Sequence, residues 1–253
     1  MIEKLGLQLY SIRGSMDTPE AARETFKRLR DMGYTCAQTA GMPISYEEFG
    51  QIANEEGIEI CGTHDDFNVM VNDPAEAIRR HKALGTKLMG IGGFSAHTPE
   101  EAEEFITKAN KVAAYAKEYG FKFTYHNHSD EFVRYENGKR LMDMLVEELD
   151  PEHTSFVLDT YWVQHGGGDV KWWINKLAGR IDILHLKDMM KLRYPLSQEI
   201  TYIGNGNLDW DGIIEVAEKA KVKYYVVEQD NAVEGDAFDY VKKSAQFLKQ
   251  YMK

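Results

Sequence analysis

The sequence predicts a single (β/α)8 TIM barrel, and three observations support that prediction. Short apolar runs rich in Val, Ile, Leu, Phe and Tyr alternate along the chain with longer segments of helical pattern. This alternation is typical of parallel strands joined by right-handed crossovers. The length of 253 residues suits one barrel, and no Pro-, Gly- or Ser-rich linker divides the chain. We therefore expect one domain over residues 1–253.

The apolar runs are the predicted strands of the barrel. They cover residues 5–11, 34–40, 58–64, 87–93, 121–127, 154–160, 181–187 and 224–230. Each is short and nearly continuous in apolar residues, as expected for a strand that is buried on both faces. An open doubly wound sheet is the alternative. The glycine-rich segments at 90–94 and 204–209 lack the dinucleotide fingerprint that would favour it.

Helices are predicted between the strands, most clearly at residues 18–33 and 98–120. Both segments begin with Thr-Pro, carry acids in the first turn and have Gly at the end. These are the signals of an N-cap, a first helical position and a C-terminal stop. The adjacent tryptophans Trp172 and Trp173 indicate a buried helix face.

Composition and charge narrow the classes of function. The net charge of −11 disfavours binding to nucleic acid, because that binding depends on Lys and Arg. No stretch approaches the roughly 18 uninterrupted apolar residues of a membrane span. The N-terminus shows no secretory pattern, and Cys36 and Cys61 are too few for a disulfide framework. We expect a cytoplasmic protein without a membrane or nucleic-acid partner, and a homo-oligomer is compatible with the sequence.

Polar residues are concentrated where the predicted strands end. Half of the eight histidines lie at such ends: His64, His126, His128 and His185. We expect the others to occupy surface or loop positions: His81, His97, His153 and His165. Barrel enzymes build their active sites at the C-terminal ends of the strands, so the first set indicates a site.

Four consecutive strands end in residues that bind metals. His126 lies at the end of the fifth predicted strand, Asp159 of the sixth, His185 of the seventh and Glu228 of the eighth. Taken singly, an Asp at a strand end often caps a helix, and a lone His is more often structural. Together, two imidazoles and two carboxylates predict a divalent metal site with mixed nitrogen and oxygen ligands.

Further candidates surround this predicted centre. His64 is expected to act as an acid or base or to contact the substrate, and Lys187 to bind an anionic oxygen. Trp162 would wall the pocket, although core packing explains it equally well. The candidates for substrate contact are Gln8, Tyr10, His128, Trp162 and Lys187.

With these residues, the chain resembles the xylose isomerase-like TIM barrels, which include sugar phosphate isomerases/epimerases, inosose dehydratases and ketose epimerases. The segments that carry the resemblance are "LGLQLYSIR" (5–13), "YHNHSDEF" (125–132), "FVLDTYWVQHGGGDV" (156–170), "GRIDILHLKDM" (179–189) and residues 202–230. The resemblance implies a divalent metal ion, manganese before magnesium, zinc or cobalt. It also implies Asp159, His185 and Glu228 as ligands. The substrate would be a small sugar or sugar phosphate.

Two positions depart from the pattern of the family. Where ketose epimerases carry a Glu-Asn-His triplet, this chain reads His126-Asn127-His128, and Gln38 replaces an acid at the end of the second strand. Epimerisation between two metal-bound glutamates is therefore in doubt. A single base remains, with Glu228 as our candidate and His64 or His126 assisting.

The function expected from the sequence is that of an isomerase or epimerase. It would abstract a proton next to a carbonyl, and the metal would stabilise the resulting enediolate. A lyase that dehydrates a keto-inositol or cleaves a 3-keto sugar is one alternative. A non-catalytic sugar-binding barrel subunit is another.

Overall fold

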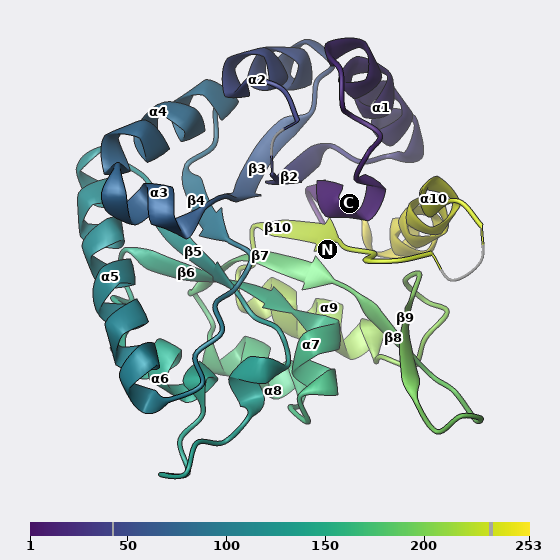
Figure 1. Ribbon diagram of the computed structural model, residues 1–253. Coiled ribbons are helices and arrows are strands. Elements are labelled where there is room, and N and C mark those ends of the chain that lie inside the picture. The colour runs from purple at the N-terminus through teal and green to yellow at the C-terminus, as the bar shows by residue number, and fades with distance from the viewer. Residues whose placement is uncertain (42, 233–234) are drawn as a thin grey trace.

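The computed structural model describes residues 1–41, 43–232 and 235–253. Within these residues, eight parallel strands form a nearly closed ring that helices surround (Figure 1), which confirms the predicted barrel. The strands of the ring are β1 (Leu5–Gln8), β2 (Cys36–Ala40), β3 (Glu59–His64), β4 (Leu88–Ile91), β5 (Lys122–His126), β6 (Thr154–Asp159), β7 (Ile181–Leu186) and β10 (Tyr224–Val227). Each lies inside a predicted run.

The ring is joined at its seam by a few polar contacts instead of a regular ladder. The order of the paired strands is β3-β2-β1-β10-β7-β6-β5-β4, so β3 and β4 lie at its two ends. The amide of Asp65 donates to the carbonyl oxygen of Gly90 (2.8 Å), and the amide of Gly90 donates to Thr63 Oγ1 (3.1 Å). A Cβ on Gly90 would lie 2.3 Å from the Thr63 carbonyl oxygen, so the close approach of these strands requires glycine.

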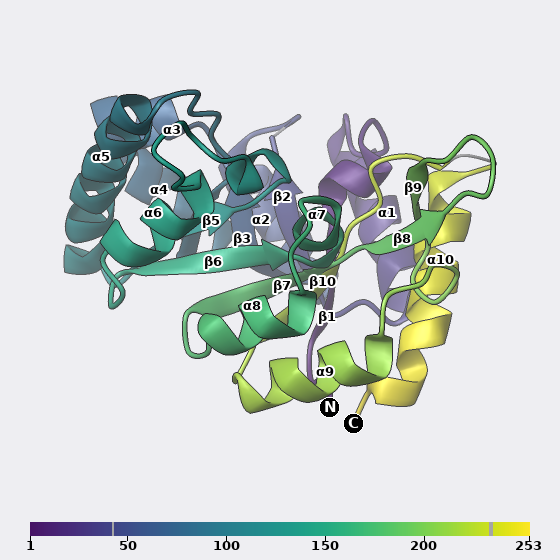
Figure 2. The ribbon, with the colours of Figure 1, turned by 90° about the horizontal axis from the view of Figure 1, so that it is seen from below.

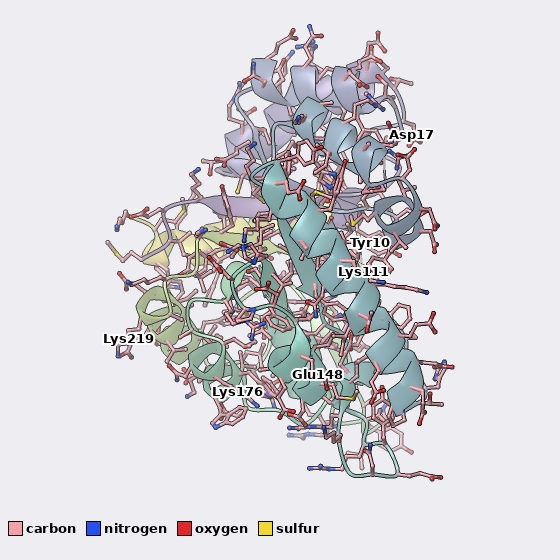
Figure 3. All side chains as sticks on the ribbon, turned by 90° about the vertical axis from the view of Figure 1, so that its left-hand side faces the viewer. Tyr10, Asp17, Lys111, Glu148, Lys176 and Lys219 are labelled. Carbon is pink, nitrogen blue, oxygen red and sulfur yellow. The ribbon has the colours of Figure 1, made fainter. Side chains whose placement is uncertain are left out.

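Helices cover the outside of the ring. They are α1 (Pro19–Met32), α2 (Tyr46–Glu55), α3 (Phe67–Asn72), α4 (Pro74–Leu84), α5 (Pro99–Glu118), α6 (Leu141–Glu148), α7 (Thr160–His165), α8 (Val170–Lys176), α9 (Trp210–Lys219) and α10 (Ala237–Leu248), with 3-10 turns η1 (Leu9–Ile12), η2 (Asp130–Phe132) and η3 (Lys249–Tyr251). Thr18 and Thr98 cap α1 and α5 as predicted. Lys111, Glu148 and Lys219 point outward from helices (Figure 3). In the described part of the chain, no helix has the length and apolar character needed to cross a membrane.

Three expectations from the sequence are corrected. β1 ends at Gln8, because the side chain of Gln8 accepts a hydrogen bond from the amide of Tyr10 and starts η1. His81 is fully buried in α4, where its ring nitrogens bond Thr63 Oγ1 and the Ala77 carbonyl, both at 2.7 Å. Trp172 is 53% exposed, so only Trp173 of this pair faces the core.

A two-stranded hairpin follows β7 and was not predicted. β8 (Asp188–Lys191) pairs antiparallel with β9 (Gln198–Thr201), and the hairpin projects beside the ring (Figure 1 and Figure 2). The buried carboxylate of Asp188 accepts hydrogen bonds from the amides of Gly204 and Gly206 and from Trp210 Nε1. Asp188 therefore anchors the loop that leads into α9, and it faces away from the polar end of β7.

Candidate functional site

His126, Asp159, His185 and Glu228 gather at the C-terminal mouth of the barrel. Each offers one ligand atom, and these atoms all lie within 4.8 Å of one another. All four side chains are buried. They come from β5, β6, β7 and the residue after β10, so neighbouring strands bring together positions that are far apart in the sequence.

The nitrogen and oxygen atoms of the cluster face one small space. His185 Nδ1 lies 3.1 Å from Glu228 Oε2 and 3.7 Å from Asp159 Oδ2. His126 Nε2 lies 3.5 Å from Asp159 Oδ2 and 3.9 Å from Glu228 Oε2. Two imidazole nitrogens and two carboxylate oxygens form a donor set that suits manganese, zinc or cobalt.

The far side of each imidazole is held by an oxygen acceptor. His126 Nδ1 lies 3.2 Å from the Gly92 carbonyl oxygen, and His185 Nε2 bonds the amide oxygen of Gln38. Only a ring nitrogen that carries hydrogen can bond such an oxygen, so in the neutral form of each ring the opposite nitrogen presents its lone pair to the cluster. Metal-binding histidines are typically oriented in this way, and the four residues fit a divalent ion. Sequence reasoning had assigned Gln38 no role.

Asp159 is oriented by its backbone and by the helix that it begins. Strand register places it opposite His185 on β7. Its Oδ1 accepts from the amide of Trp162 (2.9 Å) and caps α7, and its own amide donates to Asn127 Oδ1 (3.0 Å). Its second oxygen, Oδ2, is left to face the imidazoles. The capping role of Asp159 therefore leaves one carboxylate oxygen available to a ligand.

A buried lysine lies against the carboxylates. Lys187 is 1% exposed, and its Nζ lies 3.0 Å from Glu228 Oε2 and 3.8 Å from Asp159 Oδ2. Asp230 Oδ1 completes its surroundings at 2.7 Å. Asp230 ends the last predicted strand (224–230) but was assigned no role from the sequence, although its spacing of two residues from Glu228 was a usable signal.

Charge keeps the acids of the cluster ionised. Burial alone would raise the pKa of Asp159, but Lys187 and the two imidazoles lower that pKa to about 2. In the same way, Lys187 and His185 outweigh burial and hold the pKa of Glu228 well below its usual range. Burial would lower the pKa of His185, yet Glu228 and Asp159 raise it to about 9. The metal-free cluster is thus a set of carboxylates paired with cations.

Two further imidazoles border the cluster. The His64 ring lies 4.9 Å from that of His126, and the His128 ring 4.7 Å from it on another side. Burial first, and then the neighbouring imidazoles, lower the pKa of His64 well below its usual value and that of His128 to about 4. Both rings are therefore neutral at physiological pH.

His64 presents a donor that has no partner among the described residues. Gln8 Nε2 lies 3.3 Å from His64 Nδ1 and can only donate to it, so the ring proton is on Nε2. Nε2 is buried and unpaired, as is the Trp162 Nε1 donor beside His128. Buried donors are usually satisfied, so these two atoms indicate where a polar ligand would bind.

The remaining candidates occupy different layers of the mouth. Gln8 is fully buried beneath His64, whereas Tyr10 is 43% exposed on η1 (labelled in Figure 3), where Arg13 lies over its ring. Trp162 contacts both the His128 ring and the Lys187 ammonium.

Glu131 supports the segment that carries His126 and His128. It is 1% exposed, and its oxygens accept from Tyr125 Oη and from the amide of His128, both at 2.8 Å. Burial raises its pKa. Nothing in the sequence distinguishes this buried acid from the exposed Asp130 beside it.

Comparison with known proteins identifies the fold and the family. Inosose dehydratase from Geobacillus thermodenitrificans is 28% identical over 169 residues, which are 60% of this chain and 55% of that protein. Inosose dehydratase from Mesomycoplasma hyopneumoniae strain J is 27% identical over 133 residues, 51% of this chain and 41% of that protein. The chain thus spans about half the length of the curated relatives that it matches.

Solved structures match over nearly the whole chain. A sugar phosphate isomerase/epimerase from Parabacteroides distasonis superposes with a TM-score of 0.82 at 24% identity and covers 97% of each chain. D-allulose 3-epimerase from Methylomonas sp. superposes with a TM-score of 0.73 at 14% identity, over 98% of each chain. Their low identity means that they establish the fold alone. The model of the xylose isomerase-like TIM barrel family matches residues 26–251, and this chain belongs to that family.

Proposed function

We propose that this protein is a divalent-metal-dependent enzyme that isomerises a sugar or sugar phosphate by moving a proton next to a carbonyl group. The observation that carries the proposal is the buried cluster of two imidazoles and two carboxylates at the mouth of the barrel. The relatives named above are isomerases, epimerases and dehydratases, all of which act on sugars or polyols by their printed names.

His126, Asp159, His185 and Glu228 would hold the ion, with manganese the first choice and magnesium, zinc and cobalt the alternatives. When bound, such an ion would polarise a carbonyl oxygen and make the neighbouring carbon more acidic. The buried carboxylates and the oriented imidazoles support this assignment. Metal ligands must be deprotonated: the carboxylates are already ionised, and a protonated imidazole has to lose only one proton.

Glu228 is the base that we propose for the carbon-bound proton. Lys187 and His185 keep it ionised, so its carboxylate can accept a proton at neutral pH. In an isomerisation, the proton leaves one carbon for Glu228 and returns to the adjacent carbon. The hydroxyl proton moves between the two substrate oxygens, for which the Nε2–H of His64 is a nearby hydrogen-bond donor.

His126 supports a reaction other than epimerisation between two carboxylates. It ends β5, where the resemblance to ketose epimerases implies a glutamate, and the described residues place no second glutamate in the cluster. A single carboxylate base supports proton transfer on one face of a substrate. Isomerisation and elimination both satisfy that condition.

Dehydration of a keto-polyol is the second candidate, and the inosose dehydratases among the relatives favour it. Glu228 would again take the proton from carbon. The neighbouring hydroxyl group would leave as water with the proton that Glu228 took from carbon, and the Nε2–H of His64 would donate a hydrogen bond to the departing oxygen.

Proton exchange with solvent tests the proposal. Keto-sugars and their phosphates are incubated with the protein and Mn²⁺ in deuterated water, and NMR follows the products. An isomerase places deuterium on carbon without loss of water, whereas a dehydratase releases water. At Mn²⁺ concentrations that saturate the variant, Glu228→Gln should lower the exchange rate by about 10²–10⁴-fold.

The matched control is Glu118→Gln, because Glu118 is an exposed acid at the end of α5. This control should leave both exchange and metal content unchanged. Full exchange by the Glu228→Gln variant would remove Glu228 from the role of base. No exchange by the unaltered protein with any substrate and any of the four metals would refute the enzymatic proposal.

A further inference from the structure

Lys187 and Asp230 form an ion pair inside the mouth that ordinary packing does not explain. Lys187 is among the largest fully buried side chains of the described residues, and its ammonium group has carboxylate neighbours at the ends of β6 and β10. Burying an ammonium group is expensive unless it is paired and hydrogen-bonded. This lysine is therefore part of the electrostatics of the site.

The formal charges of the mouth can be counted from these contacts. Asp159, Glu228 and Asp230 supply three negative charges, and Lys187 supplies one positive charge. The ligand imidazoles are neutral when they bind an ion. A doubly charged cation would therefore bring the total to zero.

Other charged groups nearby have partners of their own. Arg13 is exposed at the rim, and its guanidinium donates to the backbone carbonyl oxygens of Tyr10 and Asp230. The buried carboxylate of Glu131 is bonded to Tyr125 and to the amide of His128. Neither group contacts the ligand atoms of the cluster.

We propose that the Lys187–Asp230 pair sets the charge of this site, so that the metal-loaded mouth is neutral and selects uncharged hydroxy-carbonyl compounds over phosphate esters. This inference rests on the proposed function and narrows its substrate class. Lys187 alone would leave the loaded site positive and attract an anion. Asp230 neutralises that charge, and its ion pair with the ammonium group of Lys187 competes with any anion that enters the mouth.

Metal affinity is the first test, because it does not depend on activity. Mn²⁺ binding is measured by isothermal titration calorimetry on the full chain. Lys187→Met removes a positive charge beside the ligands and should tighten binding by about tenfold or more, since unit charges a few ångströms apart interact strongly at a partly buried site. Asp230→Asn leaves Lys187 uncompensated and should weaken binding by about tenfold or more.

The double variant Lys187→Met/Asp230→Asn is the charge-matched control. It removes one charge of each sign, so its affinity for Mn²⁺ should return to within about threefold of the unaltered protein. Equal shifts in the same direction for both single variants, or no shift in either, would overturn the proposal. If Lys187→Met does not fold, Asp230→Asn still tests the proposal, because it keeps the buried lysine.

Inorganic phosphate is the probe for selectivity. The Mn²⁺-loaded unaltered protein should bind phosphate weakly, and Asp230→Asn should bind it at least about tenfold more tightly. Phosphate binding as tight in the unaltered protein as in Asp230→Asn would refute the exclusion of anions. An unaltered protein that binds no Mn²⁺ would overturn the proposed function as well, whereas Mn²⁺ binding with unshifted variants overturns only this inference.

Discussion

The two ends of the barrel surround buried acids in different ways. At the base, Asp182 near the start of β7 is 4% exposed and pairs with Lys122 (3.1 Å) and Lys223 (2.5 Å). At the mouth, Asp159 and Glu228 have only buried imidazoles and Lys187 as neighbouring cations among the described residues.

The difference lies in where the cations come from. The base lysines reach in from solvent, with side chains 30% and 62% exposed, so water can replace either of them. The cations of the mouth are themselves buried, and with Asp230 the acids outnumber Lys187 by three to one. Acids that pair with solvent-exposed lysines stabilise the fold. Acids that share one buried lysine lack enough positive charge to neutralise them, and a metal ion can supply it.

Asp159→Asn should give the largest effect on the mouth. Asparagine caps a helix about as well as aspartate, so α7 should persist. The loss of a charged ligand should weaken Mn²⁺ binding by at least about a hundredfold. Even residues that only hydrogen-bond to a metal ligand change metal affinity by about 10–100-fold when they are replaced. Calorimetric titration measures this, and circular dichroism checks the fold. Unchanged affinity would remove Asp159 from the ligand set.

Asp182→Asn is the corresponding change at the base. It leaves two lysine ammonium groups without their buried acceptor, so the free energy of unfolding should fall by about 1–3 kcal/mol. Urea denaturation measures the loss. Mn²⁺ affinity should stay at the value of the unaltered protein, and a loss of metal binding here would erase the contrast between the two ends.

The pH dependence of metal binding sharpens the description of the mouth. In the metal-free cluster, burial would lower the pKa of His185, but the negative charges of Glu228 and Asp159 outweigh burial and raise the pKa to about 9. Protonation of His185 therefore stabilises the metal-free fold. This stabilisation is fully present at a pH below 6.5, the ordinary pKa of histidine, and it is lost as the pH rises through about 9. Metal requires the neutral ring, so Mn²⁺ affinity should rise with pH and level off above about 9.

The proton released by His185 can be counted directly. Calorimetry near neutral pH in buffers of different ionisation enthalpy should show about one proton released per Mn²⁺ bound. A pH-independent affinity with no proton release would mean that the ion does not displace the proton of His185.

Lys223→Ala should have the smallest effect. Its side chain is 62% exposed, and Lys122 continues to pair with Asp182. The free energy of unfolding should therefore fall by less than about 1 kcal/mol, as for exposed ion pairs in general. A loss as large as that of Asp182→Asn would show that the base depends on this one lysine.

The strands were predictable because burial on both faces leaves a strong local signature. Every strand of the ring lies inside a predicted apolar run, and caps such as Thr18 and Thr98 marked the helices. The hairpin β8–β9 escaped prediction because half-exposed strands in a polar segment have no such signature. His81 escaped because its burial depends on a partner, Thr63, that lies on another strand.

The ligand candidates could be read from strand ends, but the contacts that orient them could not. Gln38, Asn127 and Asp230 are ordinary polar residues in the sequence. Each contacts the cluster or its lysine only because strands from separate parts of the chain meet at the mouth.

The barrel, the family and the residues at the strand ends were predictable from the sequence, because alternating apolar runs, capping signals and motifs are local properties of the chain. The neutral tautomer of each imidazole, the burial of Lys187 and the charge balance of the mouth follow only from the folded structure. These depend on distances between atoms on different strands, and electrostatic energies in a buried space change steeply with such distances.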